Sequence, residues 1–367
     1  MREITARLTP GLSKHYGNIP LHKADPFIVS RFTDLVTIVS QLSIVNKDYV
    51  LLYRGQMVDY KNKSGSSTFY PTIYRPEIGK EYLWTNEVNR RFEVLKQCGR
   101  LLVESLDAYK MRDISHIRDR ELVRWSILQH YQVCGTPLFD VTQSLSIACS
   151  FATRANNLTH GYVYIFGLPY PANRITRDSE HDIILIRLLG VTPPTARKPL
   201  YQEGYLVATD EIRDIYSRKS DLDFKRRLVA KFKIPTAKIF WDGGFSQHPR
   251  SVLDPSDEIG YICDGIKEQI YEPIVVGDLK VFFELAIEIE KRITQMDSKG
   301  GSTILDHISN LDIWGFTDKG IQAGKDVFDF RDKAIKSRVP LSDTWVRSEI
   351  KKARAILINL QQLIDRQ

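Results

Sequence analysis

The chain has 367 residues, of which 43% are hydrophobic and 26% charged, and this composition excludes a mainly disordered or fibrous protein. At roughly 100–200 residues per domain, the length predicts two domains or one large domain with an appendage. Lysine and arginine exceed aspartate and glutamate by 52 − 45 = 7, which favours an anionic partner such as nucleic acid. A generally solvated basic surface explains the same charge equally well.

Cysteine and histidine usage points away from metal sites and disulfides. The chain has four cysteines without C-x-x-C spacing, and its eight histidines form no i, i+4 pair. The N-terminus lacks the apolar run of a signal peptide, and no stretch approaches the ~18 apolar residues of a membrane span. We therefore expect a cytoplasmic protein with no metal site and no membrane contact.

The first third of the chain predicts a helix, a strand and a second helix. Asp25-Pro26 predicts a helix start, because Asp favours the N-cap and Pro the first helical position. The apolar run 49–53 predicts a buried strand that ends at Arg54-Gly55. Helical spacing of apolar residues predicts the second helix over 85–109.

The rest of the chain predicts a sheet followed by helices. A strand over 138–142 leads into a helix over 143–155. Five more strands are predicted from β-branched and aromatic runs, at 162–168, 183–189, 205–209, 226–234 and 238–241. Beyond residue 270 the pattern turns helical, at 279–293 and 345–364.

These elements predict an α+β protein with two parts. Residues 1–270 would form a mixed β-sheet core with flanking helices and an N-terminal helix. Residues 271–367 would form a helical C-terminal region.

Tyr53-Arg54-Gly55-Gln56 is the first segment with a chemical signal. An Arg at the end of an apolar strand can project a fixed guanidinium into a cleft, where its planar fork suits phosphate or ribose. The following Gly lets a ligand or another backbone approach closely. The alternative is an Arg that ends its strand in a surface salt bridge.

The second segment runs from Gln129-His130-Tyr131 to Asp140, Thr142 and Ser144. Its polar residues alternate through a strand and lead into a helix. Thr142 or Ser144 would serve equally well as a helix cap, and Asp140 as a turn residue. The combination nevertheless favours a binding or catalytic wall.

Gln202-Glu203-Gly204 is the third segment, and it stands directly before an apolar strand. A carboxylate in this position could polarise a hydroxyl group or act as a general base. The alternative is an exposed loop glutamate.

Together these segments resemble the FRG-domain family, named for a (Phe/Tyr)-Arg-Gly motif that Tyr53-Arg54-Gly55 matches. The family's Leu-Gln-His-[His/Tyr] stretch and the Asp and Thr that follow it match within 128–144, and a later Gln-x-Gly matches Gln202 and Gly204. The resemblance spans roughly residues 25–265 and leaves out the C-terminal helices. Pro137 and Val141 stand where the family often has Arg and Trp.

FRG domains are in turn similar to ADP-ribosyltransferases, and this resemblance implies the expected function. Those folds carry an Arg or His at the end of a first strand, a strand-to-helix segment with Ser, Thr or an aromatic residue, and a Glu opening a later strand. Arg54, the 140–144 segment and Glu203 fall in that order. The resemblance implies an NAD-dependent ADP-ribosyltransferase, acting as a toxin in phage defence and controlled by an antitoxin protein.

The resemblance also implies roles for individual residues. Arg54 would hold the ribose or phosphates of NAD, and Tyr131 or the Thr142 region would pack against nicotinamide. Glu203 would bind the ribose hydroxyl and stabilise the oxocarbenium-like state. We thus expect Glu203, Arg54 and Tyr131 to be catalytic. The other expected NAD-site residues are Gly55, Gln56, His130, Asp140, Thr142, Ser144 and Gln202.

Nucleic acid is the expected acceptor of the ADP-ribosyl group. The segments 213–233 and 331–354 each contain eight basic and three acidic residues, so each carries 8 − 3 = +5. Such clusters suit phosphate contacts, and Tyr216, Phe224 and Trp345 could add base stacking. Two solvated basic faces are the alternative. Two further hypotheses for the whole chain are a non-enzymatic nucleic-acid-binding module and an NAD glycohydrolase.

Overall fold

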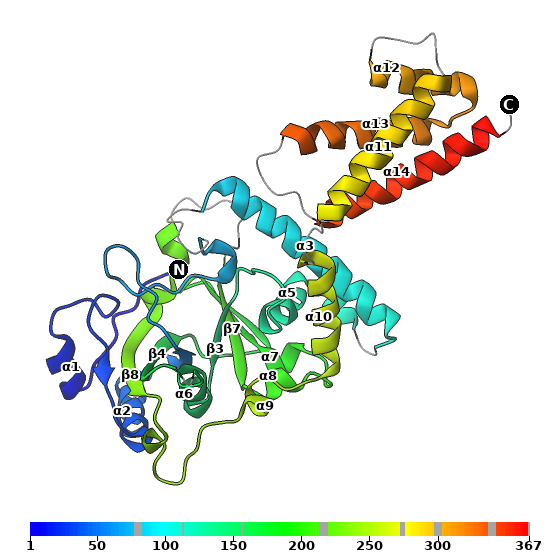
Figure 1. Ribbon diagram of the computed structural model, residues 1–367. Coiled ribbons are helices and arrows are strands. Elements are labelled where there is room, and N and C mark those ends of the chain that lie inside the picture. The colour runs from blue at the N-terminus through cyan, green and yellow to red at the C-terminus, as the bar shows by residue number, and fades with distance from the viewer. Residues whose placement is uncertain are drawn as a thin grey trace. The chain divides into compact units, whose positions relative to one another are not determined.

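The computed structural model describes residues 1–76, 83–111, 114–155, 157–210, 212, 219–271, 276–296, 303–336 and 343–365. The chain divides into two compact units, Met1–Ile266 and Lys267–Gln367 (Figure 1). The first unit contains the sheet and the second is helical. The mixed helix-and-sheet composition predicted from the sequence is therefore confirmed.

The core of the first unit is an eight-stranded sheet in the order β1-β8-β4-β2-β3-β7-β6-β5. Its strands are β1 Phe27–Ile28, β2 Val50–Gln56, β3 Phe139–Thr142, β4 His160–Leu168, β5 Ile175–Asp178, β6 Ile183–Arg187, β7 Gly204–Thr209 and β8 Leu228–Pro235. All neighbours are antiparallel except β1, which runs parallel to β8. The sheet is mixed because of that one edge strand.

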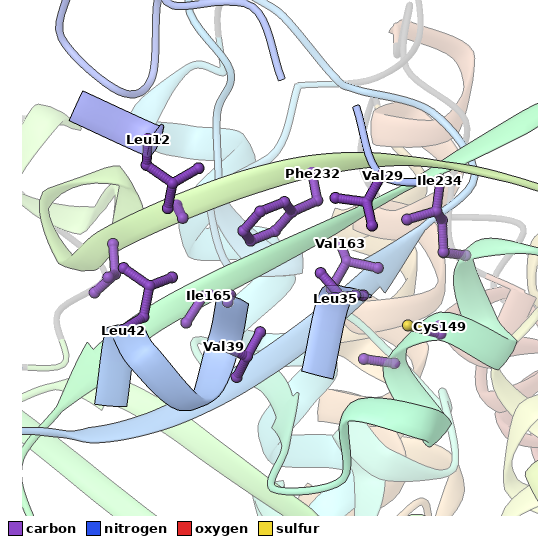
Figure 2. Packing of buried hydrophobic residues seen from close by; sticks show 14 of the residues in the cluster. Leu12, Val29, Leu35, Val39, Leu42, Cys149, Val163, Ile165, Phe232 and Ile234 are labelled. Atoms are coloured by element: carbon purple, nitrogen blue, oxygen red, sulfur yellow. The ribbon is translucent and has the colours of Figure 1, made fainter. Parts of the chain in front are cut away.

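Three helices contribute to the core on one face of the sheet: α1 (Pro10–Tyr16), α2 (Phe32–Val45) and α6 (Leu145–Ala152). Leu12, Leu35 and Leu42 lie with Val163 and Ile165 of β4 in this cluster (Figure 2). Tyr164 and Phe166, the alternate residues of β4, belong to a second core cluster. Side chains alternate across a strand, so β4 is buried on both faces and forms a nearly continuous apolar run.

The second cluster is rich in aromatic residues. The rings of Phe139 and Phe224 stack with centroids 4.9 Å apart, and Phe69 meets Phe166 edge-on at 5.2 Å. Phe69 comes from the loop after β2, and Phe224 begins a short 3-10 helix, η3 (Phe224–Arg227). These two segments therefore contribute to the core on the face opposite α2 and α6.

The remaining helices of the first unit also bury apolar residues. A regular spacing of these residues is visible in some helix sequences and not in others. In α3 (Thr85–Ala108) the buried residues recur every three to four positions, as at Val88, Phe92 and Leu95. In α5 (Glu121–His130) seven residues are buried, including all of Trp125–His130. The other helices are α4 Ser115–Asp119, α7 Leu188–Val191, α8 Arg197–Tyr201, α9 Arg250–Leu253 and α10 Glu258–Tyr271, which runs across the division between the units.

The second unit has its own apolar core. Its helices are α11 Val276–Met296, α12 Ile304–Ser309, α13 Asp318–Lys336 and α14 Asp343–Ile364. Ile289, Val327 and Ala353, from the three long helices, are fully buried together. Thr303 caps α12, because its hydroxyl accepts a hydrogen bond from the backbone of Asp306 while the Asp306 carboxylate binds the Thr303 amide.

The helix predicted to start at Asp25-Pro26 is wrong at its beginning. Phe27 and Ile28 form β1 and pair with β8, and α2 begins at Phe32. The carboxylate of Asp242, more than 200 positions away, accepts a hydrogen bond from the Thr33 amide at 2.9 Å in the first turn of α2. The pairing of Phe27 and Ile28 with β8 therefore prevails over the helix-start signal of Asp25-Pro26.

The strand predicted over 238–241 is also wrong. Lys238–Phe240 form one 3-10 turn, η4, and Phe240 is fully buried with its ring 6.0 Å from that of Phe32. The aromatic residue Phe240 therefore packs this turn against α2. The strand predicted over 183–189 ends early at Arg187, because Leu188 begins α7.

Candidate functional site

Three neighbouring strands bring the three sequence segments into one row across the sheet. Tyr53 of β2 pairs with Thr142 of β3, and Thr142 pairs with Gly204 of β7. Since adjacent strands lie about 4.8 Å apart, the backbones of Tyr53 and Gly204 are about 10 Å apart. Segments distant in the sequence thus meet within the reach of one ligand.

A cleft opens where β2 and β3 separate. Within these two described strands, Tyr53 and Thr142 form the only paired position. Continuing the antiparallel ladder would set Gly55 opposite Asp140, and both residues instead line the cleft. The cleft encloses about 660 Å³ of empty space, part of it open to solvent. Its lining residues are Tyr53, Arg54, Gly55, His130, Gln132, Asp140, Val141, Thr142, Phe151, Lys198, Gln202, Gly204 and Asp254.

Arg54 spans the gap between β2 and β3. Its guanidinium donates a hydrogen bond to the backbone carbonyl of Asp140 at 2.6 Å and lies 4.4 Å from the centre of the Phe139 ring. Burial lowers the pKa of Arg54, and the nearby Asp140 carboxylate opposes this shift. The Nε atom is buried and has no hydrogen-bond partner among the described residues. A buried donor without a partner is energetically costly.

Asp140 is held by a chain of polar side chains. Its Oδ2 accepts a hydrogen bond from the Gln129 amide at 2.5 Å, and Gln129 in turn accepts one from the Thr136 hydroxyl. The Nδ1 atom of His130 lies 3.7 Å from the other carboxylate oxygen. Burial acts to raise the pKa of Asp140, but His130, Arg54 and Gln129 outweigh it and lower the pKa. Asp140 is therefore ionised at neutral pH.

The opposite wall of the cleft carries a second cation. Lys198 of α8 lies 3.1 Å from Oδ1 of Asp254, whose Oδ2 lies 3.0 Å from Arg154. Gln202 is buried and donates a hydrogen bond from its amide to the carbonyl of Leu253. Sequence reasoning missed Lys198 and Asp254, because neither belongs to a motif and they come from the short helix α8 and the C-terminal end of the short helix α9.

Glu203 lies beside the cleft and not among its lining residues. Its neighbours Gln202 and Gly204 both line the cleft, whereas the Glu203 side chain is exposed. Its carboxylate accepts a hydrogen bond from the Gln143 amide at 3.0 Å. The backbone of Glu203 is left-handed, with φ of 47°, which is uncommon for a residue with a side chain. The expected catalytic carboxylate thus sits at the rim of the cleft.

Tyr131, expected to contact nicotinamide, has a structural role. It is buried outside the cleft lining, and its hydroxyl donates a hydrogen bond to Asp257 at 2.7 Å. The same carboxylate accepts hydrogen bonds from the backbone amides of Arg197, Lys198 and Gly260. Burial and Asp257 both raise the pKa of Tyr131, so the phenol stays protonated. The structure therefore places Tyr131 apart from the expected site residues that line the cleft.

Three more expected NAD-site residues differ in whether they line the cleft. Gly55 lines it, and its missing side chain makes room for the backbone of α6, the close backbone approach that the sequence predicts. Gln56 and Ser144 do not line it. The Oε1 atom of Gln56 is buried without a hydrogen-bond partner among the described residues, and the Ser144 hydroxyl lies 3.1 Å from that of Ser146. Thr142 does line the cleft, and its hydroxyl ties β3 to the Gln202 carbonyl at 2.7 Å.

The described part of the first basic segment, 219–233, directs some of its basic side chains into the core. Arg227 and Lys231 are fully buried, and Arg227 donates a hydrogen bond to the carbonyl of Gly167. Phe224 is fully buried as well, so it cannot stack on a base. Arg213, Tyr216 and Arg218 lie outside the described residues.

The C-terminal basic segment, 331–354, is partly neutralised. Arg331 lies 2.9 Å from Glu290, and Lys352 lies 2.8 Å from Glu349. The side chain of Trp345 lies outside the described residues.

No protein-family model, curated protein or solved structure matches the chain. Among the described residues, no helix is long and apolar enough to cross a membrane. Those residues also contain no group of three His, Cys, Asp or Glu side chains arranged to hold a metal ion. The candidate site is therefore defined by the cleft and its side chains.

Proposed function

We propose that this chain is an NAD-dependent ADP-ribosyltransferase that binds NAD in the cleft between β2, β3 and β7. The observation that carries the proposal is the row formed by Tyr53, Thr142 and Gly204. It gathers Arg54, the strand-to-helix segment and the glutamate-led strand around one cleft. These are the three parts, in the same chain order, that the resemblance to ADP-ribosyltransferases requires.

The side chains of the cleft suit a dinucleotide with two phosphates. Among the described residues Arg54 has an Nε–H without a hydrogen-bond partner, and a guanidinium matches phosphate or ribose oxygens with its fixed fork of donors. Lys198, which is paired with Asp254, is a second basic residue of the lining. Val141 and Phe151 supply apolar surface for the nicotinamide ring. The lining of the cleft therefore combines basic and apolar side chains.

Glu203 would act from the rim. In the proposed reaction its carboxylate exchanges the Gln143 amide for the ribose hydroxyl of NAD and stabilises positive charge that develops on the ribose. The change requires a side-chain rotation only, because Gln202 and Gly204 already hold the backbone at the cleft. The exposed side chain is free to make that rotation.

We take nucleic acid as the first acceptor to test, since the chain carries a net charge of +7. A transferase of this kind would damage the cell that makes it. The proposal therefore includes a toxin role in phage defence and an antitoxin partner, as in the family that the chain resembles.

The test uses labelled NAD with RNA, DNA and lysate protein in separate reactions. We expect the wild-type chain to label one macromolecular fraction and Glu203→Gln to lose about 100- to 1,000-fold of that rate while unfolding at the wild-type temperature. Glu180→Gln is the matched control, because this exposed carboxylate pairs with Arg2 elsewhere on the surface. Wild-type labelling by Glu203→Gln would contradict the proposal, and NAD consumption without a labelled macromolecule would indicate an NAD glycohydrolase.

A second candidate, a non-enzymatic nucleic-acid-binding module, is favoured by one observation. The Glu203 carboxylate accepts a hydrogen bond from Gln143 and is not part of the cleft lining. Salt-dependent binding of RNA or DNA without any NAD turnover would select this candidate.

A further inference from the structure

His130 is a buried group of the cleft with one unused nitrogen. It is the last residue of α5, lines the cleft and is 5% exposed. Its Nε2 atom is buried and has no hydrogen-bond partner among the described residues. His130 is thus a cleft-lining imidazole with one ring nitrogen that no described residue engages.

The other imidazole nitrogen faces a charged carboxylate. Nδ1 of His130 lies 3.7 Å from Asp140, and the Gln129 amide and the Arg54 guanidinium hold Asp140 in place. A carboxylate beside Nδ1 favours the tautomer that carries its proton there, which leaves the Nε2 lone pair free. The 3.7 Å separation exceeds a hydrogen bond, and such contacts often tighten when substrate binds.

The imidazole is also fixed in position by its neighbours. A Cβ at Gly204 would lie 3.3 Å from the Cε1 atom of His130, so the absence of a side chain lets the ring approach β7. The Tyr131 ring lies 6.0 Å away, at nearly a right angle. The charged groups that share the cleft with His130 are Arg54, Asp140, Lys198 and Asp254.

We infer that His130 is the general base of the cleft, which removes the proton from the acceptor nucleophile, and that Asp140 is its positioning residue. The inference rests on the proposed transferase function and names its proton acceptor. The bond between the ribose C1′ and the nicotinamide nitrogen breaks, and its electron pair leaves with neutral nicotinamide. A lone pair of the acceptor oxygen or nitrogen forms the new bond to C1′. The acceptor's proton passes to Nε2 of His130 and then to solvent.

His130→Asn separates this role from a packing role. The asparagine amide keeps a donor near the position of Nδ1, facing Asp140, and has no atom at the position of Nε2. We expect single-turnover transfer at saturating NAD to fall about 100- to 10,000-fold. The matched control is His116→Asn, because this imidazole contacts the Val191 carbonyl at 3.2 Å outside the cleft lining.

The pH profile gives a second readout. A general base gives the rate a limb that rises with pH, and this limb should be missing in His130→Asn. Nitrogen-15 NMR of histidine-labelled protein reads the tautomer without any substrate. We expect the proton on Nδ1 in the wild-type chain, and a mixture of tautomers in Asp140→Asn.

The outcomes separate the two proposals. A wild-type chain that cleaves NAD, with His130→Asn matching its rate and pH profile, overturns the role of His130 and leaves the transferase function in place. A proton found on Nε2 in the NMR spectrum overturns the general base as well. A wild-type chain that neither binds nor cleaves NAD overturns the transferase function and the inference that rests on it.

Discussion

Gly55 of β2 lies so close to Ala148 of α6 that a Cβ on Gly55 would be 1.7 Å from the Ala148 carbonyl oxygen. Gly161, on the neighbouring strand β4, stands in the same relation to Ala152, with a distance of 2.0 Å. Non-bonded atoms do not approach so closely. The absence of a side chain at these two glycines therefore allows α6 to pack this close to the sheet. The helix could not pack at this height on any other residue type.

Gly55→Ala should therefore destabilise the first unit strongly. Because the clash is with backbone, α6 must move, and we expect a loss of about 3 kcal/mol or more in the free energy of unfolding. Urea unfolding measures the change. The matched control is Gly265→Ala within α10, where a Cβ would meet no atom within 4 Å. This control should gain roughly 0.5–1 kcal/mol, since Ala is the better helix former. Equal stability of the two variants would contradict the packing described here.

Glu203→Gly should stabilise the fold and abolish transfer together. Glycine adopts the left-handed backbone of position 203 without strain, and relief of that strain is worth about 1 kcal/mol. Lys110→Gly is the control, because Lys110 has a similar φ of 52° and lies outside the cleft lining. It should gain similar stability and keep full transfer activity. Loss of stability in Glu203→Gly would mean that the carboxylate supports the fold.

Tyr131→Phe should lower stability and leave the chemistry intact. The variant loses a hydrogen bond to the Asp257 carboxylate, a kind of bond worth about 1.5–3 kcal/mol. NAD turnover per folded molecule should equal that of the wild-type chain, because Tyr131 lies outside the cleft lining. A stable variant without turnover would restore Tyr131 as a catalytic residue.

Tyr16 should make the fold sensitive to alkali. Burial raises its pKa to about 12, while its hydroxyl donates a hydrogen bond to the Lys231 carbonyl at 2.7 Å. The unfolded chain ionises near pH 10, so the stability that depends on the neutral phenol is complete below pH 10 and falls as pH rises toward 12. The total is about 2–3 kcal/mol.

The measurement for Tyr16 is urea unfolding between about pH 8 and 11. Tyr16→Phe should show a shallower loss of stability with pH than the wild-type chain. Tyr60→Phe, at a residue that is 57% exposed, should keep the wild-type slope. A Tyr16→Phe slope identical to the wild-type slope would contradict the raised pKa.

Strands buried on both faces were the easiest elements to predict from the sequence. The prediction for 162–168 falls within β4, and that for 205–209 falls within β7, because burial on both sides leaves a continuous apolar run. The helix start at Asp25 failed because Phe27 pairs with Phe232, a partner that no local pattern names. Local signals predict elements well only where distant contacts agree with them.

The residues of the candidate site likewise include some that the sequence indicates and others that depend on the three-dimensional structure. Arg54, Asp140 and Gln202 were singled out from three separate polar segments of the sequence, and all three line the cleft. Which of the adjacent residues His130 and Tyr131 lines the cleft depends on the orientation of the C-terminal end of α5. The sequence of the motif does not determine this orientation. The left-handed backbone of Glu203 has no sequence signature, because glycine or asparagine would be the usual residue there.

The separation of β2 from β3 has a mechanical consequence. By strand order the sheet is continuous, but across the cleft it consists of two half-sheets, β1-β8-β4-β2 and β3-β7-β6-β5. They share one ladder position, the hydrogen bond from Arg54 to the Asp140 carbonyl, and aromatic packing such as that of Phe139 against Phe166. An oxyanion that drew the Arg54 guanidinium away would release one of these contacts between the half-sheets. If NAD binds as we propose, Arg54 would therefore serve both the ligand and the sheet.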